Sequence, residues 1–367
     1  VEMHLKSSDW YHHSHEEDPN YENVILHVVW EDDTVVFDVN NSPIPTLVLK
    51  DLIDESVLEV YQKLSLAKET WIPCGNSISN VNDFTLGNWL ERLFYERLES
   101  KSQQIDTLLL ASNNNYEAVL FQLLAKNFGM NINGDSFLNL ANSIPFSILR
   151  KERGNLHKLS ALLFGQAGFL QESYEEPFHK NLKKEYLYLR HKYGVRPIIK
   201  EQFQFFRMRP HNFPTIRIAQ MASLFHKHPQ LFSELMSAKS LEQYYRFFSV
   251  DLPVFWETHY VFERESPKRA KKISKNFIDL LLINTIVPLK FNYLKRKGEL
   301  EATVLFEMIE QLASEKNAII AKFSELNVHA TNAFESQALL ELKKSYCDKK
   351  RCLNCAIGND LLKRKGS

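Results

Sequence analysis

Four histidines and five carboxylates lie within the first eighteen residues, VEMHLKSSDWYHHSHEED. Imidazole and carboxylate groups bind divalent metal ions, and an unperturbed histidine, with a pKa of roughly 6.5, can act as a base near neutral pH. Residues two apart on a strand share a face, so Glu2 and His4 are expected to project together. We predict an Mg²⁺ or Mn²⁺ site here, with Glu2, His4 and Asp9 as catalytic groups and Glu2, His13 and His15 as metal ligands.

Simpler interpretations exist for the same residues. A Glu-x-His pair occurs by chance in many strands, and HHSH (His12 to His15) is also typical of a solvated turn. His27, inside the apolar run ILHVVW, is typical of a histidine in a protein core. A third alternative is a transition-metal site for another hydrolysis, because imidazole suits zinc or iron better than magnesium. That alternative predicts zinc or iron binding that persists when all four cysteines are replaced.

The cysteines form a second candidate metal site. Cys347, Cys352 and Cys355 make a C-x4-C-x2-C pattern within YCDKKRCLNCAIG, and Cys74 is the one other cysteine. Close cysteines in a reducing compartment more often bind metal than form disulfides. Zinc takes four thiolate or imidazole ligands, and a [4Fe-4S] cluster takes four cysteines. The pattern predicts one of these groups, with Cys74 or a histidine as fourth ligand, and the alternative is a set of reduced thiols near a helix end.

Basic residues with aromatic neighbours form a candidate nucleic-acid surface. Residues 181–217 contain nine Lys and Arg but two Asp and Glu, with tyrosines and phenylalanines between them. In RMRPHNFPTIRIAQ, either Asn212 or Thr215 is expected to cap the next helix. The N-terminus of that helix can bind phosphate through its free backbone N–H groups. Arg207, Arg209 and Arg217 are expected to lie near it.

Two further basic stretches form separate patches. They are KRAKKISK (Lys268 to Lys275) and the C-terminal region at residues 341–367, which has eight Lys and Arg against three Asp and Glu and includes the run Lys349, Lys350 and Arg351 inside the cysteine loop. We predict that this run and the three arginines above contact nucleic acid, since cationic side chains bind the phosphate backbone. The alternative is that the lysines are solvated and the arginines bind carbonyl oxygens. FGQAGFL (Phe164 to Leu170) lacks the spacing of a phosphate loop and is expected to serve close helix packing.

The elements that must position these groups change in type along the chain. Residues 1–50 contain four segments with strand patterns, VEMHLKS, NVILHVVW, TVVFDV and IPTLVLK, separated by turn signals. From DLIDESVLEVYQKLSL onward the apolar period becomes helical. We therefore predict an α+β protein with a small mixed β-sheet module at residues 1–70. A large all-α domain is expected at residues 71–367, carrying the cysteine site near its end.

Charge divides the chain in the same way. The net charge is zero, yet residues 1–60 hold fourteen Asp and Glu against two Lys and Arg. The remainder is correspondingly basic, and a basic surface can bind phosphates. The longest apolar stretch, FIDLLLINTIVPLKF (Phe277 to Phe291), is too short to span a bilayer and predicts a buried helix. We expect a cytoplasmic protein with no membrane partner, and the sequence leaves its oligomeric state open.

Several motifs carry a resemblance to a known family. The stretch VEMHLKSSDWYHHSHEEDPNYENVILHVVW resembles the start of an uncharacterised bacterial family, domain of unknown function 2851. WIPC, FGQAGFL, RMRPHNFPTIRIAQ and YCDKKRCLNCAIG resemble its later motifs, so the resemblance spans essentially the whole chain. In that family an AGPDF-type segment precedes the VExH strand, and this order resembles the PD-(D/E)XK nuclease superfamily.

The resemblance implies a restriction-endonuclease-like module and a metal-dependent nuclease. Glu2 matches the metal-binding carboxylate of the superfamily, and His4 stands where its lysine stands. The paired aspartate has no match, so we expect it upstream of Val1 with one or more strands and a helix. The alternative is a catalytically inactive nucleic-acid-binding or scaffolding protein. The cysteine loop resembles the cluster-binding loops of some DNA glycosylases, although Leu361 stands roughly where their fourth cysteine would fall.

Overall fold

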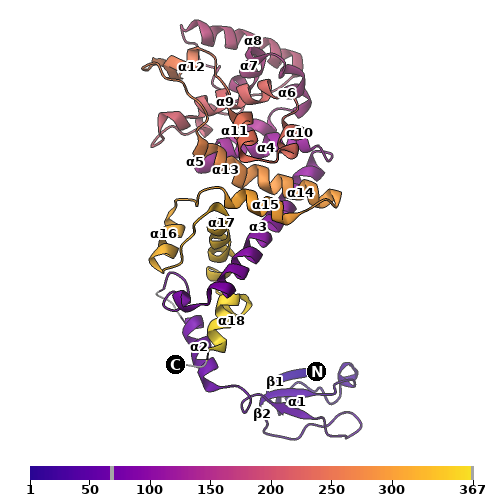
Figure 1. The fold of residues 1–367 in the computed structure, drawn as a ribbon. Coiled ribbons are helices and arrows are strands. Elements are labelled where there is room, and N and C mark those ends of the chain that lie inside the picture. Colours follow the sequence, from indigo (N-terminus) through magenta and orange to yellow (C-terminus); the bar gives the residue numbers. More distant parts are fainter. Residues whose placement is uncertain (67–69, 365–367) are drawn as a thin grey trace. The chain divides into compact units, whose positions relative to one another are not determined.

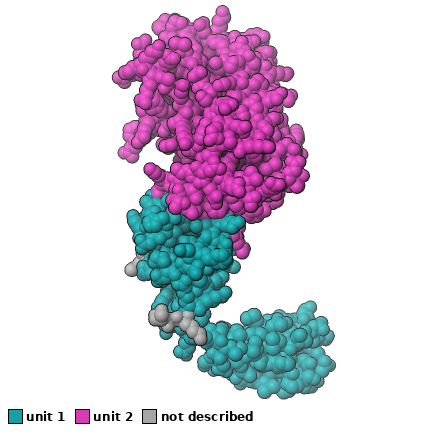
Figure 2. Space-filling view, viewed as in Figure 1, with its two compact units in different colours: residues 1–91, 318–329, 339–367 teal, residues 92–317, 330–338 magenta. Residues whose placement is uncertain are grey.

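The chain forms two compact units in the computed structural model, which describes residues 1–66 and 70–364. The first unit comprises residues 1–91, 318–329 and 339–367, and the second comprises residues 92–317 and 330–338 (Figure 2). The predicted boundary after residue 70 adjoins residues 67–69, which lie outside the described residues, and it stays a prediction. The last three residues of the basic C-terminal region also lie outside them.

A three-stranded sheet near the N-terminus carries the first candidate site (Figure 1). Its strands, in spatial order, are β1 (Glu2–Lys6), β2 (His27–Glu31) and β3 (Thr46–Val48). Both neighbouring pairs are parallel, and the register places Glu2 beside His27 and His4 beside Val29. The sequence predicted a mixed sheet, whereas these three strands are all parallel. An apolar pattern identifies a strand but does not give the direction of its neighbour.

One predicted strand does not form. Residues 34–39 were expected to be a strand, and this prediction is wrong: the segment is a turn closed by a single bridge between Phe37 and Pro43. The Asp38 carboxylate accepts hydrogen bonds from the backbone N–H groups of Asn40 and Ser42, each at 2.8 Å. Such local side-chain bonds compete with strand pairing, which explains why the alternating pattern did not suffice.

Outside the sheet and the loops, the first unit is helical. It holds a short helix after β1 and three helices further along the chain. These are α1 (Asp9–His12), α2 (Glu55–Leu66), α16 (Ala318–Glu325) and α18 (Ala356–Lys363). Two helices have residues in both units, α3 (Asp83–Ala111) and α17 (Ala333–Glu341). Helix α18 packs against α2, which places the C-terminal segment beside the residues that follow the sheet.

The second unit is built from helices and one small hairpin. The hairpin strands are β4 (His259–Val261) and β5 (Arg264–Glu265). The helices are α4 (Tyr116–Phe128), α5 (Met130–Asn142), α6 (Phe146–Glu152), α7 (Leu156–Gln166), α8 (Pro177–Tyr193), α9 (Pro214–Lys227), α10 (Leu231–Ser237), α11 (Leu241–Phe248), α12 (Phe255–Thr258), α13 (Lys275–Leu281), α14 (Val287–Lys297) and α15 (Ala302–Glu310). The predicted α+β class is confirmed, with a small sheet and a large helical region.

Helix α7 packs against both α8 and α9, and a glycine makes the first of these contacts possible. A Cβ atom at Gly165 would lie 2.1 Å from the ring of Tyr186 on α8. The two backbones therefore approach more closely than any side chain would allow. The expectation that FGQAGFL serves close helix packing agrees with this geometry.

The apolar stretch near residue 280 forms a continuous helical segment. Helix α13 passes through a π-helical turn, η5 (Leu282–Ile286), into α14. Among the described residues, Lys275–Lys297 is the one helix long and apolar enough to cross a membrane, and 67% of its apolar window is buried inside the protein. The stretch was expected to be too short to span a bilayer, but the helix has 23 residues and is long enough. Its burial is nevertheless typical of a core helix, as predicted. Cytoplasmic localisation stays a prediction.

Candidate functional site

Three of the predicted histidines converge beside β1, and we call His4, His13 and His15 the histidine cluster. One ring nitrogen from each lies within 4.8 Å of the other two. His13 Nδ1 is 3.2 Å from His4 Nε2, and a Glu2 carboxylate oxygen is 3.9 Å from the same His4 nitrogen. The structure thus brings the strand pair Glu2 and His4 together with the two histidines of the following turn.

The turn that carries His13 and His15 has a strained backbone. Ser14, between them, has φ of 57°, in the left-handed region that residues other than glycine seldom adopt. This conformation follows the short helix α1, and the imidazoles on either side of Ser14 both lie beside His4. Strained residues of this kind persist only where the surrounding structure holds them, and they concentrate at functional sites.

His27 lies behind the cluster on the neighbouring strand and orients one of its members. It is fully buried, and its Nε2 is 2.8 Å from His4 Nδ1. For His4 to present a lone pair at Nε2, its proton must be on Nδ1 and must be donated to His27. The sequence suggested a core histidine at this position, and burial is what the structure shows, but the hydrogen bond to His4 was not anticipated.

Burial keeps these two imidazoles in their neutral form. It lowers the pKa of His4 more than the Glu2 carboxylate raises it. Burial also lowers the pKa of His27, and the neighbouring His4 lowers it further. A neutral imidazole has the free lone pair that a metal ion requires, so the local environment favours the metal-binding form.

An aromatic wall fixes His15. Its ring stacks on Tyr21 with centroids 3.7 Å apart, and Trp10 meets it edge-on at 5.4 Å. Trp10 is 1% exposed and forms the core of the module with Val36 and Ile44. The histidine cluster is therefore attached to the small hydrophobic core through His15, a link that the polar sequence pattern does not reveal.

Asp9 occupies a different position from the one its sequence suggested. Its carboxylate accepts a hydrogen bond from the Lys6 backbone N–H at 3.0 Å and lies 3.5 Å from the exposed ring of His12. The Lys6 bond lowers the pKa of Asp9. Asp9 is not part of the group of atoms that converges on His4. Its contacts are those of a residue that closes the turn after β1.

The two serines of SSDW bind a single carboxylate. Ser7 Oγ donates to Asp33 at 2.9 Å, while the Ser8 backbone and hydroxyl each donate to it at 2.8 Å. The backbone N–H groups of Asp33 and Thr34 return hydrogen bonds to Ser7 Oγ. These bonds, from Ser8 first, lower the pKa of Asp33 to about 2. They attach the start of α1, the helix that leads to His13 and His15, to the segment after β2.

All four cysteines meet in the first unit, and we call Cys74, Cys347, Cys352 and Cys355 the cysteine site. They line one cavity, together with apolar side chains such as Ile357. Burial raises the pKa of each thiol, to about 12 for Cys74. The predicted association of Cys74 with the distant C-x4-C-x2-C loop is thus present in the geometry.

The size of the cysteine site admits both predicted groups. Zinc–sulfur bonds of about 2.3 Å place tetrahedral sulfurs about 3.8 Å apart. Among the described residues, which include all four cysteines, no three sulfurs lie within 4.8 Å of one another. This spacing is wider than a single ion needs and favours a cluster. The cavity holds about 20 Å³, which favours a single ion. Zinc and iron–sulfur therefore both remain candidates.

Local backbone geometry builds the cysteine loop. Cys347 ends a π-helical turn, η6 (Leu342–Cys347), and Cys355 immediately precedes α18. A Cβ atom at Gly358 would lie 2.2 Å from the backbone oxygen of Cys352, so only glycine lets α18 approach the loop. The three cationic residues between the cysteines, Lys349, Lys350 and Arg351, are exposed on this loop.

The stretch RMRPHNFPTIRIAQ (Arg207 to Gln220), which we call the arginine motif, contributes two of its three arginines to one cavity. Arg209 and Arg217 line it, and Arg207 does not. The expected helix cap is absent: Phe213 precedes α9 without a side-chain cap. The amide oxygen of Asn212 instead accepts a hydrogen bond from Arg217 at 2.7 Å.

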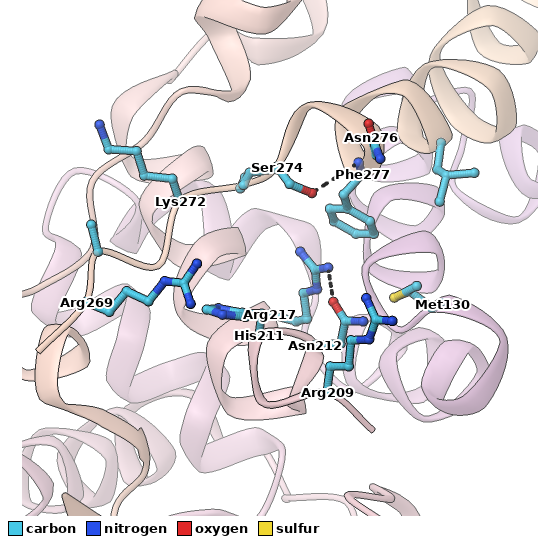
Figure 3. A pocket seen from close by; sticks show the side chains of 13 residues that line it. Met130, Arg209, His211, Asn212, Arg217, Arg269, Lys272, Ser274, Asn276 and Phe277 are labelled. Carbon is cyan, nitrogen blue, oxygen red and sulfur yellow. Dashed lines mark hydrogen bonds between the residues drawn. The ribbon is translucent and has the colours of Figure 1, made fainter. Parts of the chain in front are cut away.

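The same cavity receives residues from the stretch KRAKKISK. Arg269 and Lys272 lie across it from the arginine motif (Figure 3). These two basic segments are more than fifty residues apart in the sequence, and no pattern in either one indicated that they meet.

Comparison with known proteins identifies the family. A family model described as "Protein of unknown function (DUF2851)" matches residues 1–318, so the chain belongs to this family. No curated protein and no solved structure matches the chain. The predicted family membership is confirmed, whereas the likeness of the N-terminal module to PD-(D/E)XK nucleases stays a proposal.

Proposed function

We propose that this DUF2851 family member is a metal-dependent nuclease whose metal ion is held by the histidine cluster. The observation that carries the proposal is the convergence of three imidazole nitrogens within 4.8 Å of one another, beside the Glu2 carboxylate. Three imidazoles suit zinc or iron better than the Mg²⁺ or Mn²⁺ expected for the superfamily. The donor set thus supports the transition-metal alternative for the ion and the nuclease resemblance for the reaction.

Each residue has a definite part in this proposal. His4, His13 and His15 are the proposed ligands, and Glu2 lies where it completes the set or accepts a proton. When bound, the ion would supply Lewis acidity toward a phosphate oxygen and lower the pKa of a water molecule. His27 is the proposed positioning residue, because its hydrogen bond to His4 Nδ1 selects the tautomer that leaves Nε2 available.

Nucleic acid is the proposed partner. The region after residue 60 carries an excess of Lys and Arg, and cationic side chains bind phosphate backbones through counterion release. Exposed cations at Lys349, Lys350 and Arg351 next to the cysteine site support the same partner. The cysteine site is proposed to hold zinc or a [4Fe-4S] cluster that fixes the C-terminal loop to the segment that carries Cys74.

A cleavage assay tests the proposal. The protein, purified without air, is offered single- and double-stranded DNA and RNA with Zn²⁺, Fe²⁺, Mn²⁺ or Mg²⁺ in turn. We expect cleavage that is lost in His4→Ala and His13→Ala. His12→Ala is the matched control, since His12 is in the same segment but its side chain is 74% exposed and outside the cluster.

Two other outcomes would overturn parts of the proposal. Nucleic-acid binding without cleavage under any metal would favour the inactive binding protein. Cleavage that His4→Ala and His13→Ala both retain would place the chemistry elsewhere in the chain.

A further inference from the structure

A cationic cavity lies in the second unit, separate from both metal-ligand sets. It has a volume of about 570 Å³ and is partly open to solvent. Four of its lining residues are cationic, namely Arg209, Arg217, Arg269 and Lys272, and a fifth is His211, whose pKa is lowered by burial and by the neighbouring cations. Of the residues that the structure describes, no aspartate or glutamate lines it. We call it the basic cavity, and Figure 3 shows that Arg269 extends toward His211 and Arg217, whereas the amino group of Lys272 points away from them.

Arg217 is the central feature of the cavity wall. It is 4% exposed, and its guanidinium carbon lies 3.5 Å above the ring of Phe277. Two of its nitrogens donate to the amide oxygens of Gln220, at 2.8 Å, and Asn212, at 2.7 Å. Its Nε is buried without a hydrogen-bond partner. A buried charge is costly unless an opposite charge accompanies it, and these amide partners carry none.

The charge on Arg217 persists at neutral pH. Burial lowers the pKa of Arg217 to about 9, which still leaves the guanidinium protonated at pH 7. Among the described residues, no carboxylate forms an ion pair with Arg217, nor with Arg209, Arg269 or Lys272. The nearby Glu257 does pair, with Lys268 at 3.2 Å, but neither residue lines the cavity. The wall is therefore an uncompensated concentration of positive charge.

We propose that the basic cavity binds the terminal phosphate of a nucleotide, either free or at the phosphorylated end of a strand. A phosphomonoester carries close to two negative charges at pH 7, which matches several cations better than a single carboxylate would. Guanidinium groups donate in a planar fork that suits phosphate oxygens. Arg209 and Arg269 are exposed and line the cavity, so their donors are within reach of a ligand there. Ser274 and Asn276 add uncharged polar groups at the rim.

The shape of the cavity separates this proposal from backbone binding. A groove that tracks a strand distributes its cations along a line. Here the three arginines line one hollow, whose wall also includes the apolar side chains of Met130, Phe277 and Leu280. A phosphate with an attached organic group fits such a mixed wall. The proposal does not depend on the hydrolytic activity of the histidine cluster.

Calorimetric titration without added divalent metal tests the proposal. The probes are inorganic phosphate, adenosine 5′-monophosphate, and one single-stranded oligonucleotide prepared with and without a 5′-phosphate. We expect Arg209→Gln and Arg269→Gln each to weaken binding of the monophosphate about fivefold or more, and the double variant more than tenfold. Both residues are exposed, so the variants should fold normally. Arg150→Gln, an exposed arginine of α6 outside the cavity, is the matched control and should bind as the parent does.

The probes distinguish the sources of the phosphate. Binding of the monophosphate but not the phosphorylated oligonucleotide would identify a free nucleotide. A preference for the phosphorylated over the unphosphorylated oligonucleotide would identify a strand end. The proposal is overturned if no phosphate-bearing probe binds, or if the double variant binds them as tightly as Arg150→Gln does.

Discussion

At the scale of single residues, the first eighteen positions separate into groups with different tasks. Glu2 and His4 project from β1 toward the turn histidines, whereas Asp9, predicted to be catalytic, closes a turn on the Lys6 backbone. Spacing on a strand was enough to predict the first pair, since alternate residues share a face. It was not enough for Asp9, because the backbone bond that holds it depends on how the chain turns after β1.

Replacement of His27 tests how the cluster is oriented. His27→Gln removes the imidazole that fixes the tautomer of His4, and loss of such an outer partner typically weakens metal affinity about 10–100-fold. Competition against a coloured chelator measures this affinity. His27 is buried, so circular dichroism of the variant must match the parent. Unchanged affinity in a folded His27→Gln protein would show that the hydrogen bond to His4 has no part in metal binding.

Asp33 gives the N-terminal module an acid-sensitive contribution. Its pKa is about 2 in the folded protein, below the ordinary value of 3.8, because Ser8 and Ser7 donate hydrogen bonds to its charged form. Its stabilisation is complete above about pH 4 and is lost as the pH falls toward 2. Asp33→Asn should therefore lower stability at pH 7 and flatten the decline between pH 4 and pH 2.

Hydrogen exchange during urea titration, followed in peptides from residues 1–40, measures this effect separately from the rest of the chain. Parallel declines for the parent and Asp33→Asn below pH 4 would contradict the assignment.

At the scale of elements, apolar period predicted the helices well and the sheet only in part. The pattern that begins at residue 51 becomes helix α2 from Glu55, and the stretch at residues 277–291 lies in a helical segment, because a long 3.6-residue stripe has few alternatives. Residues 34–39 alternate like a strand but form a turn, since Asp38 binds its own neighbouring backbone. The secondary structure of a short segment depends on such local contacts, and the spacing of its apolar residues does not reveal them.

Gly165 tests the packing of α7 against α8. Gly165→Ala should destabilise the protein by about 1–3 kcal/mol, because its methyl group would overlap the ring of Tyr186. Gly154→Ala is the matched control, as a Cβ there has no atom within 4 Å. Urea unfolding compares the two free energies. Equal stability of the two variants would show that the helices can move apart at no cost.

At the scale of the whole molecule, contacts between distant parts of the sequence were the least predictable feature. The loop that carries Cys347 to Cys355 suggested a metal site by itself, and the partnership with Cys74 followed only from the count of cysteines. The basic cavity combines Arg209 and Arg217 with Arg269, and nothing in either segment indicated the other. Such contacts depend on tertiary packing, which leaves no local pattern.

The two metal sites should be independent. Replacing all four cysteines by serine should abolish bound iron or zinc at the cysteine site and lower the melting temperature, because metal binding contributes folding energy. The histidine cluster should keep its own ion. Metal analysis of protein purified without air, with a visible spectrum to separate iron–sulfur from zinc, measures the first effect. Unchanged metal content in the serine variant would show that these cysteines bind nothing.

The central claim is that His4, His13 and His15 form a metal site, and a cobalt titration tests it most directly. Co²⁺ replaces zinc and its visible spectrum reports the ligands, so the titration is made on the variant that lacks all four cysteines. We predict one bound equivalent in that protein and in its His12→Ala derivative, and loss of binding in the His4→Ala and His13→Ala derivatives. Absence of a bound equivalent, or binding that survives both of these substitutions, would contradict the account.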